Sequence, residues 1–166
     1  MNYSEARPHI KDGDIVQVRT AHSLFGYATK FFTGVYTHTG IAVWLDGGLW
    51  LVEINGGRNH LIPLSQLAGM EFDVYLPPKG VSRAEIRKAA LESIRVRVEY
   101  GFAAVVAAWV NEFFRINKVI HWRNQLECAG YVVKILVAAG WHNQSFIVSP
   151  TKLSTLLVIK LEVRHE

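Results

Sequence analysis

Residues 37–54 of the chain have the sequence THTGIAVWLDGGLWLVEI. Two apolar runs, 37–45 and 49–54, flank the turn sequence Asp46-Gly47-Gly48. An Asp-Gly pair between runs of β-branched and aromatic residues is typical of a β-hairpin. The stretch therefore predicts two antiparallel strands in which residues 42–45 pair with residues 49–52.

Two polar side chains on this hairpin are candidates for chemistry. His38 opens the first strand, and Glu53 lies near the end of the second. The pairing above places Glu53 opposite Ile41, within diagonal reach of His38. A strand holds a catalytic histidine more rigidly than a loop does, and a neighbouring carboxylate fixes its tautomer. The structural alternatives are a strand-end histidine bonded to a turn and an outward-facing surface acid.

The rest of the chain predicts more strands first and helices afterwards. Strand-like residues recur at 15–20, 60–62, 70–76 and 156–163. Residues 21–33 suggest a short helix or a structured loop. Helical patterns occupy the C-terminal half, at 82–94, 102–114 and 126–139. The expected fold class is α+β: one domain over residues 1–166, with a mostly antiparallel sheet packed against helices.

Several helix ends have recognisable signals. Ser82 and Glu85 have the spacing of a capping box, and Gly140 is placed to end the helix over 126–139. Ser149-Pro150 has the pattern of an N-cap followed by proline at the first helical position. These signals predict where three helical segments begin or end.

The third helix begins in the stretch QLECAGYVV, residues 125–133, which holds the only cysteine of the 166 residues. A lone cysteine excludes an internal disulfide and a Cys-Cys metal site. Because the start of a helix carries partial positive charge, a thiol in its first turn ionises more readily. Cys128 is therefore a candidate nucleophile, and the small residues Ala129 and Gly130 would let a substrate approach. The alternative is a buried cysteine that acts as a small hydrophobe.

Other kinds of site find less support. Six further histidines lie in polar or loop contexts with no strand or helix to fix them: His9, His22, His60, His121, His142 and His165. His38, Glu53 and His60 can be combined into a metal-ligand set, but no close-spaced H-x-x-x-H or H-x-H pair supports it. Phosphate-binding and dinucleotide fingerprints are also missing. We expect no metal and no cofactor.

Composition sets limits on the class of protein. Half of the residues are hydrophobic and 19% are charged, as in globular proteins. The net charge of +4 comes from scattered lysines and arginines, so we expect no nucleic-acid partner. The N-terminal residues lack the apolar core of a signal peptide, and the longest apolar run, 102–110, is too short to span a membrane. These features predict a cytoplasmic protein.

Six short motifs together resemble a known family. They are GDIVQV (13–18), THTGIAVW (37–44), WLVEINGG (50–57), VEYGF (98–102), LECAGYVVKIL (126–136) and SPTKLSTL (149–156). Their order resembles the circularly permuted branch of the NlpC/P60 superfamily. This branch contains papain-like amidases grouped with the YiiX and YaeF proteins and, more distantly, the lecithin:retinol acyltransferases. The likeness extends over about residues 12–156.

The resemblance implies a papain-like fold and a set of catalytic roles. Cys128 matches the family nucleophile, His38 its base and Glu53 the residue that orients the base. Ala129 stands where the family often has Ser or Thr, and Tyr100 matches an aromatic position of uncertain role.

The activity that the resemblance implies is cleavage of an amide through an acyl-enzyme, with cell-wall peptide as one candidate substrate. A lipid-directed thiol esterase or acyltransferase is the alternative that the aromatic-rich segments 25–36 and 102–114 would suit. A non-catalytic ligand-binding member of the same fold is the third reading.

Overall fold

The computed structural model describes residues 1–20, 35–55, 58–96, 98–100, 125–126, 128–142 and 149–164. The helices are α1 (Tyr3–Ala6), α3 (Arg83–Ser93), α5 (Cys128–Ala138) and α6 (Pro150–Ser154), with 3-10 turns η1 (Arg7–His9) and η2 (Leu64–Leu67). The strands are β1 (Ile15–Val18), β2 (His38–Leu45), β3 (Gly48–Asn55), β4 (Arg58–Pro63), β5 (Phe72–Tyr75), β6 (Glu99–Tyr100), β7 (Gln125–Leu126) and β8 (Ile159–Val163).

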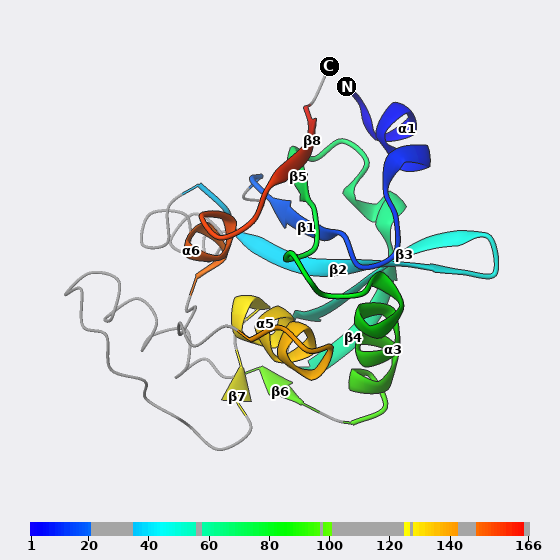
Figure 1. The fold of residues 1–166 in the computed structure, drawn as a ribbon. Helices are drawn as coiled ribbons and strands as arrows, with labels where there is room; N and C mark the ends of the chain where they lie inside the picture. The colour runs from blue at the N-terminus through cyan, green and yellow to red at the C-terminus, as the bar shows by residue number, and fades with distance from the viewer. Residues whose placement is uncertain are drawn as a thin grey trace.

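The eight strands form a single sheet in the order β7-β6-β4-β3-β2-β1-β5-β8. Neighbouring strands are antiparallel except for the short parallel pair of β6 and β7. Helices α3 and α5 lie together on one side of this sheet (Figure 1). The predicted α+β class, with a mostly antiparallel sheet packed against helices, is confirmed. Within the described residues, no helix has both the length and the apolar character needed to cross a bilayer.

The turn between β2 and β3 is one residue shorter than the sequence suggested. Asp46 and Gly47 both have positive φ, 48° and 76°, as a two-residue type I′ hairpin turn requires. Gly48 is therefore the first residue of β3 and pairs with Leu45, so Ile41 faces Val52. The predicted pairing of Ile41 with Glu53 was wrong by one residue.

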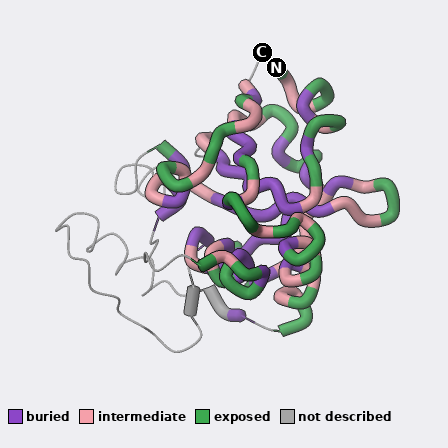
Figure 2. Tube along the Cα trace, viewed as in Figure 1, coloured by how far each residue is buried: buried purple, intermediate pink, exposed green. Residues whose placement is uncertain are grey.

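Alternating residues of the sheet belong to two separate cores. The central strands are buried along most of their length (Figure 2). On β2, Ile41 and Val43 pack with buried residues of α3 and α5, such as Ile86 and Leu136. The intervening Ala42 belongs to a second cluster on the opposite face of the sheet. That cluster also contains Ala6, Ile10, Leu64 and Leu67 from α1, η1, η2 and their flanking residues. Both faces of the central strands are thus covered, which fixes the register because a slip of one residue would exchange the two faces.

The predicted helix ends can be compared directly with the structure. Gly140 has φ 98° just beyond α5, and Ser149 caps α6 by accepting a hydrogen bond from the Lys152 amide, so both predictions are confirmed. The capping box was wrong, because the Ser82 side chain makes no capping hydrogen bond to α3. The expected elements at 21–33 and 102–114 lie outside the described residues.

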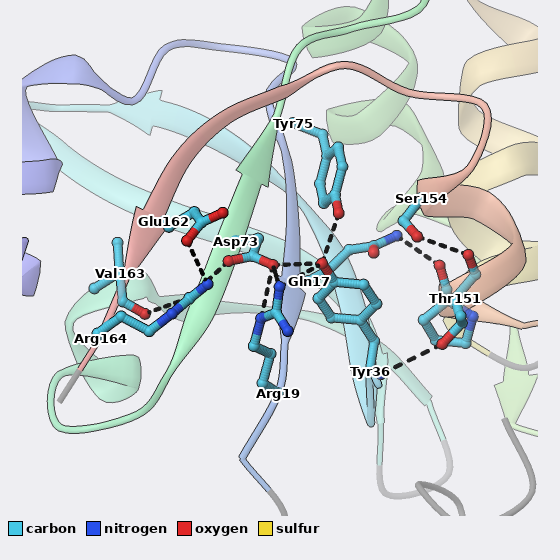
Figure 3. Close-up of polar contacts among 11 residues, drawn as sticks. Gln17, Arg19, Tyr36, Asp73, Tyr75, Thr151, Ser154, Glu162, Val163 and Arg164 are labelled. Carbon is cyan, nitrogen blue, oxygen red and sulfur yellow. Dashed lines mark hydrogen bonds and ion pairs between the residues drawn. The ribbon is translucent and has the colours of Figure 1, made fainter. Parts of the chain in front are cut away.

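The buried carboxylate of Asp73 links strands β1, β5 and β8 at one end of the sheet order (Figure 3). Asp73 on β5 is fully buried and pairs with Arg19, just after β1, and with Arg164, just after β8. The hydroxyl of Tyr36 donates to the same carboxylate and lies 2.6 Å from the Tyr75 hydroxyl. Burial raises the pKa of Asp73, but hydrogen bonds from two arginines and a tyrosine outweigh it and hold the pKa below its ordinary value.

Candidate active site

The three residues proposed from the sequence come from three different elements of the fold. His38 is the first residue of β2, Glu53 lies on β3, and Cys128 is the first residue of α5. Nε2 of His38 lies 2.6 Å from Oε2 of Glu53. Cys128 lies near the same imidazole and, with Glu53, raises the pKa of His38. The structure thus brings the thiol, the imidazole and the carboxylate together.

The short β2–β3 turn is what makes the contact between His38 and Glu53 possible. Continuing the ladder one step beyond the Ile41–Val52 pair sets Glu53 opposite Gly40. Side chains alternate along a strand, so Glu53 then projects on the same side as Gly40 and His38. A three-residue turn would have put Glu53 on the opposite face of the sheet from His38.

Gly40 allows the two strands to approach closely at this point. A Cβ atom at this position would lie 2.8 Å from the Leu51 side chain and 2.8 Å from the Val52 carbonyl oxygen. The backbone oxygen cannot rotate away as a flexible side chain can, so the position requires glycine for space rather than for its φ angle.

The hydrogen bonds define which nitrogen of His38 faces which partner. A carboxylate can only accept, so Nε2 donates its hydrogen to Glu53. The other ring nitrogen, Nδ1, is left for Cys128. Burial lowers the pKa of His38, but hydrogen bonds and charge interactions with Cys128 and Glu53 outweigh this and raise the pKa to about 10. The site therefore favours the protonated form of His38 at neutral pH.

Glu53 is a buried acid, with 3% of its side chain exposed. Burial alone would raise its pKa, but the His38 hydrogen bond and the charges of His38 and His60 lower it below the ordinary value. An ionised carboxylate is therefore held under the imidazole of His38. The prediction that Glu53 is a surface-facing acid, one of the alternatives above, is wrong.

His60 also belongs to this cluster, although the sequence suggested it only as a metal ligand together with His38 and Glu53. Its context was expected to be polar or a loop, but it lies on β4 directly opposite Glu53. Its Nε2 is 3.2 Å from Oε1 of Glu53, the oxygen that His38 does not use. The signal was present in the sequence, since the Asn55-Gly56-Gly57 turn followed by a strand over 58–63 would have paired the two residues.

The entry of the chain into β2 is held by Tyr36, two residues before His38. Its backbone amide lies 3.4 Å from the Thr151 hydroxyl of α6, and its own hydroxyl donates to Asp73 (Figure 3). The Thr37 hydroxyl lies 3.2 Å from the Val18 carbonyl oxygen and 3.0 Å from the Thr20 carbonyl oxygen, which share its one hydrogen. The two residues that precede His38 are thus held by hydrogen bonds to α6, to Asp73 and to the backbone at the end of β1.

The metal-ligand set considered above, His38, Glu53 and His60, is brought together by the fold. Both imidazoles have a nitrogen close to a Glu53 oxygen, at 2.6 Å for His38 and 3.2 Å for His60. Across the described part of the chain, no group of three His, Cys, Asp or Glu side chains is arranged to hold a metal. His9 is exposed on η1, His142 follows α5, and the predictions for His22, His121 and His165 lie outside the described residues.

Comparison with known proteins places the fold. No protein-family model matches the sequence, and a search of curated proteins finds no match. Among solved structures, the chain is similar to the metalloprotein YiiX from Escherichia coli O157:H7 (DUF1105), with a TM-score of 0.59 and 17% sequence identity. The match covers 92% of this chain and 89% of YiiX.

The chain has a YiiX-like fold. At 17% identity the likeness to YiiX extends to the fold and not to an activity. The resemblance to the YiiX-like branch is confirmed at that level.

Proposed function

We propose that the chain is a cysteine hydrolase that cleaves an amide bond through an acyl-enzyme. The observation that supports this most directly is the position of His38, which is hydrogen-bonded to Glu53 and close enough to Cys128 for the thiol to raise its pKa. A nucleophile, a base and a group that orients the base are the three parts that thiol catalysis requires. The YiiX-like fold agrees with the permuted papain-like architecture in which the motifs are arranged in this order.

Before the substrate binds, the proton of the Cys128 thiol has already moved to Nδ1 of His38, so the resting pair is a thiolate and an imidazolium. The thiolate then attacks the carbonyl carbon of the substrate, and the C=O π electrons move to the oxygen. Cys128 is the first residue of an 11-residue helix, so the developing oxyanion forms near the positive end of the α5 dipole. Throughout this step Glu53 accepts a hydrogen bond from Nε2 and keeps the ring oriented.

The second step breaks the bond to the leaving group. The imidazolium of His38 donates its proton to the amine, the C–N bond breaks, and a thioester to Cys128 remains. Water attacks this thioester while His38 accepts its proton, and the thiolate is released with the carboxylic acid product. An acceptor amine or alcohol in place of water would give acyl transfer by the same residues.

The substrate class that we propose is a peptide-type amide, with cell-wall peptide as the first candidate. The aromatic-rich segments 25–36 and 102–114 were the basis for a lipid substrate. Most of the first and all of the second lie outside the described residues, so the structure adds nothing in favour of lipid. YiiX is called a metalloprotein. In this chain His38 is already engaged by Glu53 and Cys128, so we assign no step to a metal.

The chain's single cysteine makes the test direct, because any thiol label reports on Cys128 alone. We expect iodoacetamide to alkylate Cys128 at about pH 6–7 much faster than it alkylates free cysteine, whose thiolate is scarce at that pH. The His38→Ala variant should lose this low-pH reaction, while His9→Ala, a change at an exposed histidine, should keep it. Reactivity no greater than that of free cysteine, together with unchanged amide turnover in Cys128→Ala, would sink the proposal.

A further inference from the structure

His60 has contacts that a surface histidine does not need. It is 33% exposed, lies opposite Glu53 across the β3–β4 ladder, and uses both ring nitrogens. Nε2 lies 3.2 Å from Oε1 of Glu53, and Nδ1 lies 3.0 Å from the backbone carbonyl oxygen of Arg58.

The chemistry of these two partners fixes the protons on the ring. A carbonyl oxygen and an ionised carboxylate oxygen are both acceptors only. A neutral imidazole has one donor nitrogen and one acceptor nitrogen, so it can satisfy one of these partners and must face the other with a lone pair. Both contacts are favourable only if both nitrogens of His60 carry hydrogen, which makes the ring a cation.

The charges of Cys128, His38 and Glu53 also favour a positive charge on His60. In the ion-paired state, Cys128 and Glu53 are negative and His38 is positive, which leaves one negative charge in excess. Glu53 is 3% exposed, and an uncompensated buried charge is costly. A protonated His60 makes the four groups neutral together. It can exchange its proton with solvent, since a third of its side chain is exposed.

We propose that His60 is a positioning residue for the Cys128–His38 pair, which it assists by donating to Glu53 as an imidazolium. It holds the carboxylate so that Oε2 stays on His38 and Oε1 is occupied. His60 contacts no reacting atom; it acts through Glu53. The role rests on the proposed function, because it has meaning only if the Cys128–His38 pair is reactive.

The sign of its effect on the pair follows from its charge. A nearby cation favours loss of a proton from any neighbouring group. Removing the charge of His60 therefore makes the thiol of Cys128 harder to ionise and makes Glu53 easier to protonate. Both changes move the acid limb of Cys128 reactivity to higher pH.

The test compares His60→Gln with the wild-type chain and with His9→Gln as the matched control. Glutamine can still donate one hydrogen bond to Glu53 but carries no charge, so a purely structural role for His60 would leave the pH profile in place. We expect the acid limb of iodoacetamide alkylation to move up by about 0.5 pH unit or more in His60→Gln only. Thermal unfolding of both variants verifies that the fold is retained.

A second measurement does not depend on any substitution. The ¹⁵N chemical shifts of the His60 ring, at about pH 6–7, distinguish a doubly protonated ring from either neutral tautomer. We expect both nitrogens to be protonated. A neutral His60, or a His60→Gln acid limb that coincides with that of the wild type, would overturn the positioning role alone. A wild-type chain without low-pH alkylation would instead overturn the proposed function.

Discussion

The α-carbon of Gly40 faces the carbonyl oxygen of Val52 across the β2–β3 ladder, and a methyl group on Gly40 would lie only 2.8 Å from that oxygen. The close approach occurs two residues beyond His38 and one residue before Glu53. Any change that separates the strands here also separates the imidazole from the carboxylate.

Replacing Gly40 with alanine should therefore weaken the site without altering any of its side chains. We expect loss of the low-pH alkylation of Cys128 and a decrease in the free energy of unfolding of about 1–3 kcal/mol, as for overpacked cores. Alkylation at about pH 6–7 and denaturant unfolding measure the two effects.

Thr39→Val, at the neighbouring residue of β2, is the matched control. The Thr39 hydroxyl is fully buried and has no hydrogen-bond partner among the described residues, so its removal should leave alkylation unchanged and stability unchanged or higher. Wild-type alkylation in Gly40→Ala would show that strand spacing does not control the site.

Glu53→Gln tests the carboxylate. An amide can accept from one imidazole, but its NH₂ group must then face the other, and the negative charge is lost. We expect amide turnover to fall by roughly a hundredfold, within the range that acid–base groups contribute, with a smaller effect on folding. Turnover rates and thermal unfolding of the purified variant distinguish a catalytic role of Glu53 from a structural one. A grossly unfolded Glu53→Gln protein would assign Glu53 to structure rather than to catalysis.

The raised pKa of His38 predicts an alkaline limit to activity. The imidazolium must protonate the leaving amine, and its pKa of about 10 keeps the proton in place through neutral pH. Turnover should therefore be steady at neutral pH and fall as the pH passes about 10. In Glu53→Gln the anion that helps to raise this pKa is gone, so the fall should begin at a lower pH. An alkaline limb at the same pH in both proteins would contradict the coupling.

Asp73 gives a prediction about stability alone. Replacing it with asparagine removes the shared partner of Arg19 and Arg164. We expect to lose about 2–3 kcal/mol of the free energy of unfolding, less than for fully buried pairs because both arginines are partly exposed.

The pH dependence of that loss has a definite sign. The folded-state pKa of Asp73 is lowered, so its contribution is complete above the unfolded value of about 3.8 and disappears as the pH falls through the folded value. Urea unfolding at several pH values should thus show the wild type and Asp73→Asn converging only below about pH 4. A difference that stays constant into strong acid would mean that the carboxylate charge is not what stabilises the fold.

A chelator provides the last check. The imidazole nitrogens of His38 and His60 that lie nearest Glu53 are occupied by that carboxylate, so amide turnover should be unaffected by dialysis against EDTA. Loss of turnover that returns with an added divalent metal would require a different arrangement of these residues.

The sequence was informative where local signals suffice. The Asp-Gly turn predicted the hairpin, and Gly140 predicted the end of α5. The apolar period predicted the start of that helix at 126, whereas Leu126 lies in β7 and α5 begins at Cys128. Turn length was harder, because Asp46-Gly47 and Asp46-Gly47-Gly48 are both plausible turns and differ by one residue. That single residue decides on which face of the sheet Glu53 projects.

Contacts between distant residues could not be predicted in this way. The Asp73 cluster joins residues 19, 36, 73 and 164, which only the order of the strands brings together. Ser82 is a case in which a local pattern predicted a contact that does not form, since its spacing to Glu85 fits a capping box but its side chain makes no capping hydrogen bond. Local patterns therefore predicted the elements well, but partners along the sheet depended on pairings that local patterns leave open.

In the charge state proposed above, Cys128, His38, Glu53 and His60 alternate in sign, and this determines the electric field that a substrate meets at a distance. Four charges of alternating sign that sum to zero produce a field that decays quickly, so a substrate approaching from solvent is neither drawn in nor repelled by them. The ion pair can then remain strongly polarised at short range without favouring a cationic or an anionic ligand. Selection by charge, if the protein makes one, must come from the surface around the site rather than from its reactive centre.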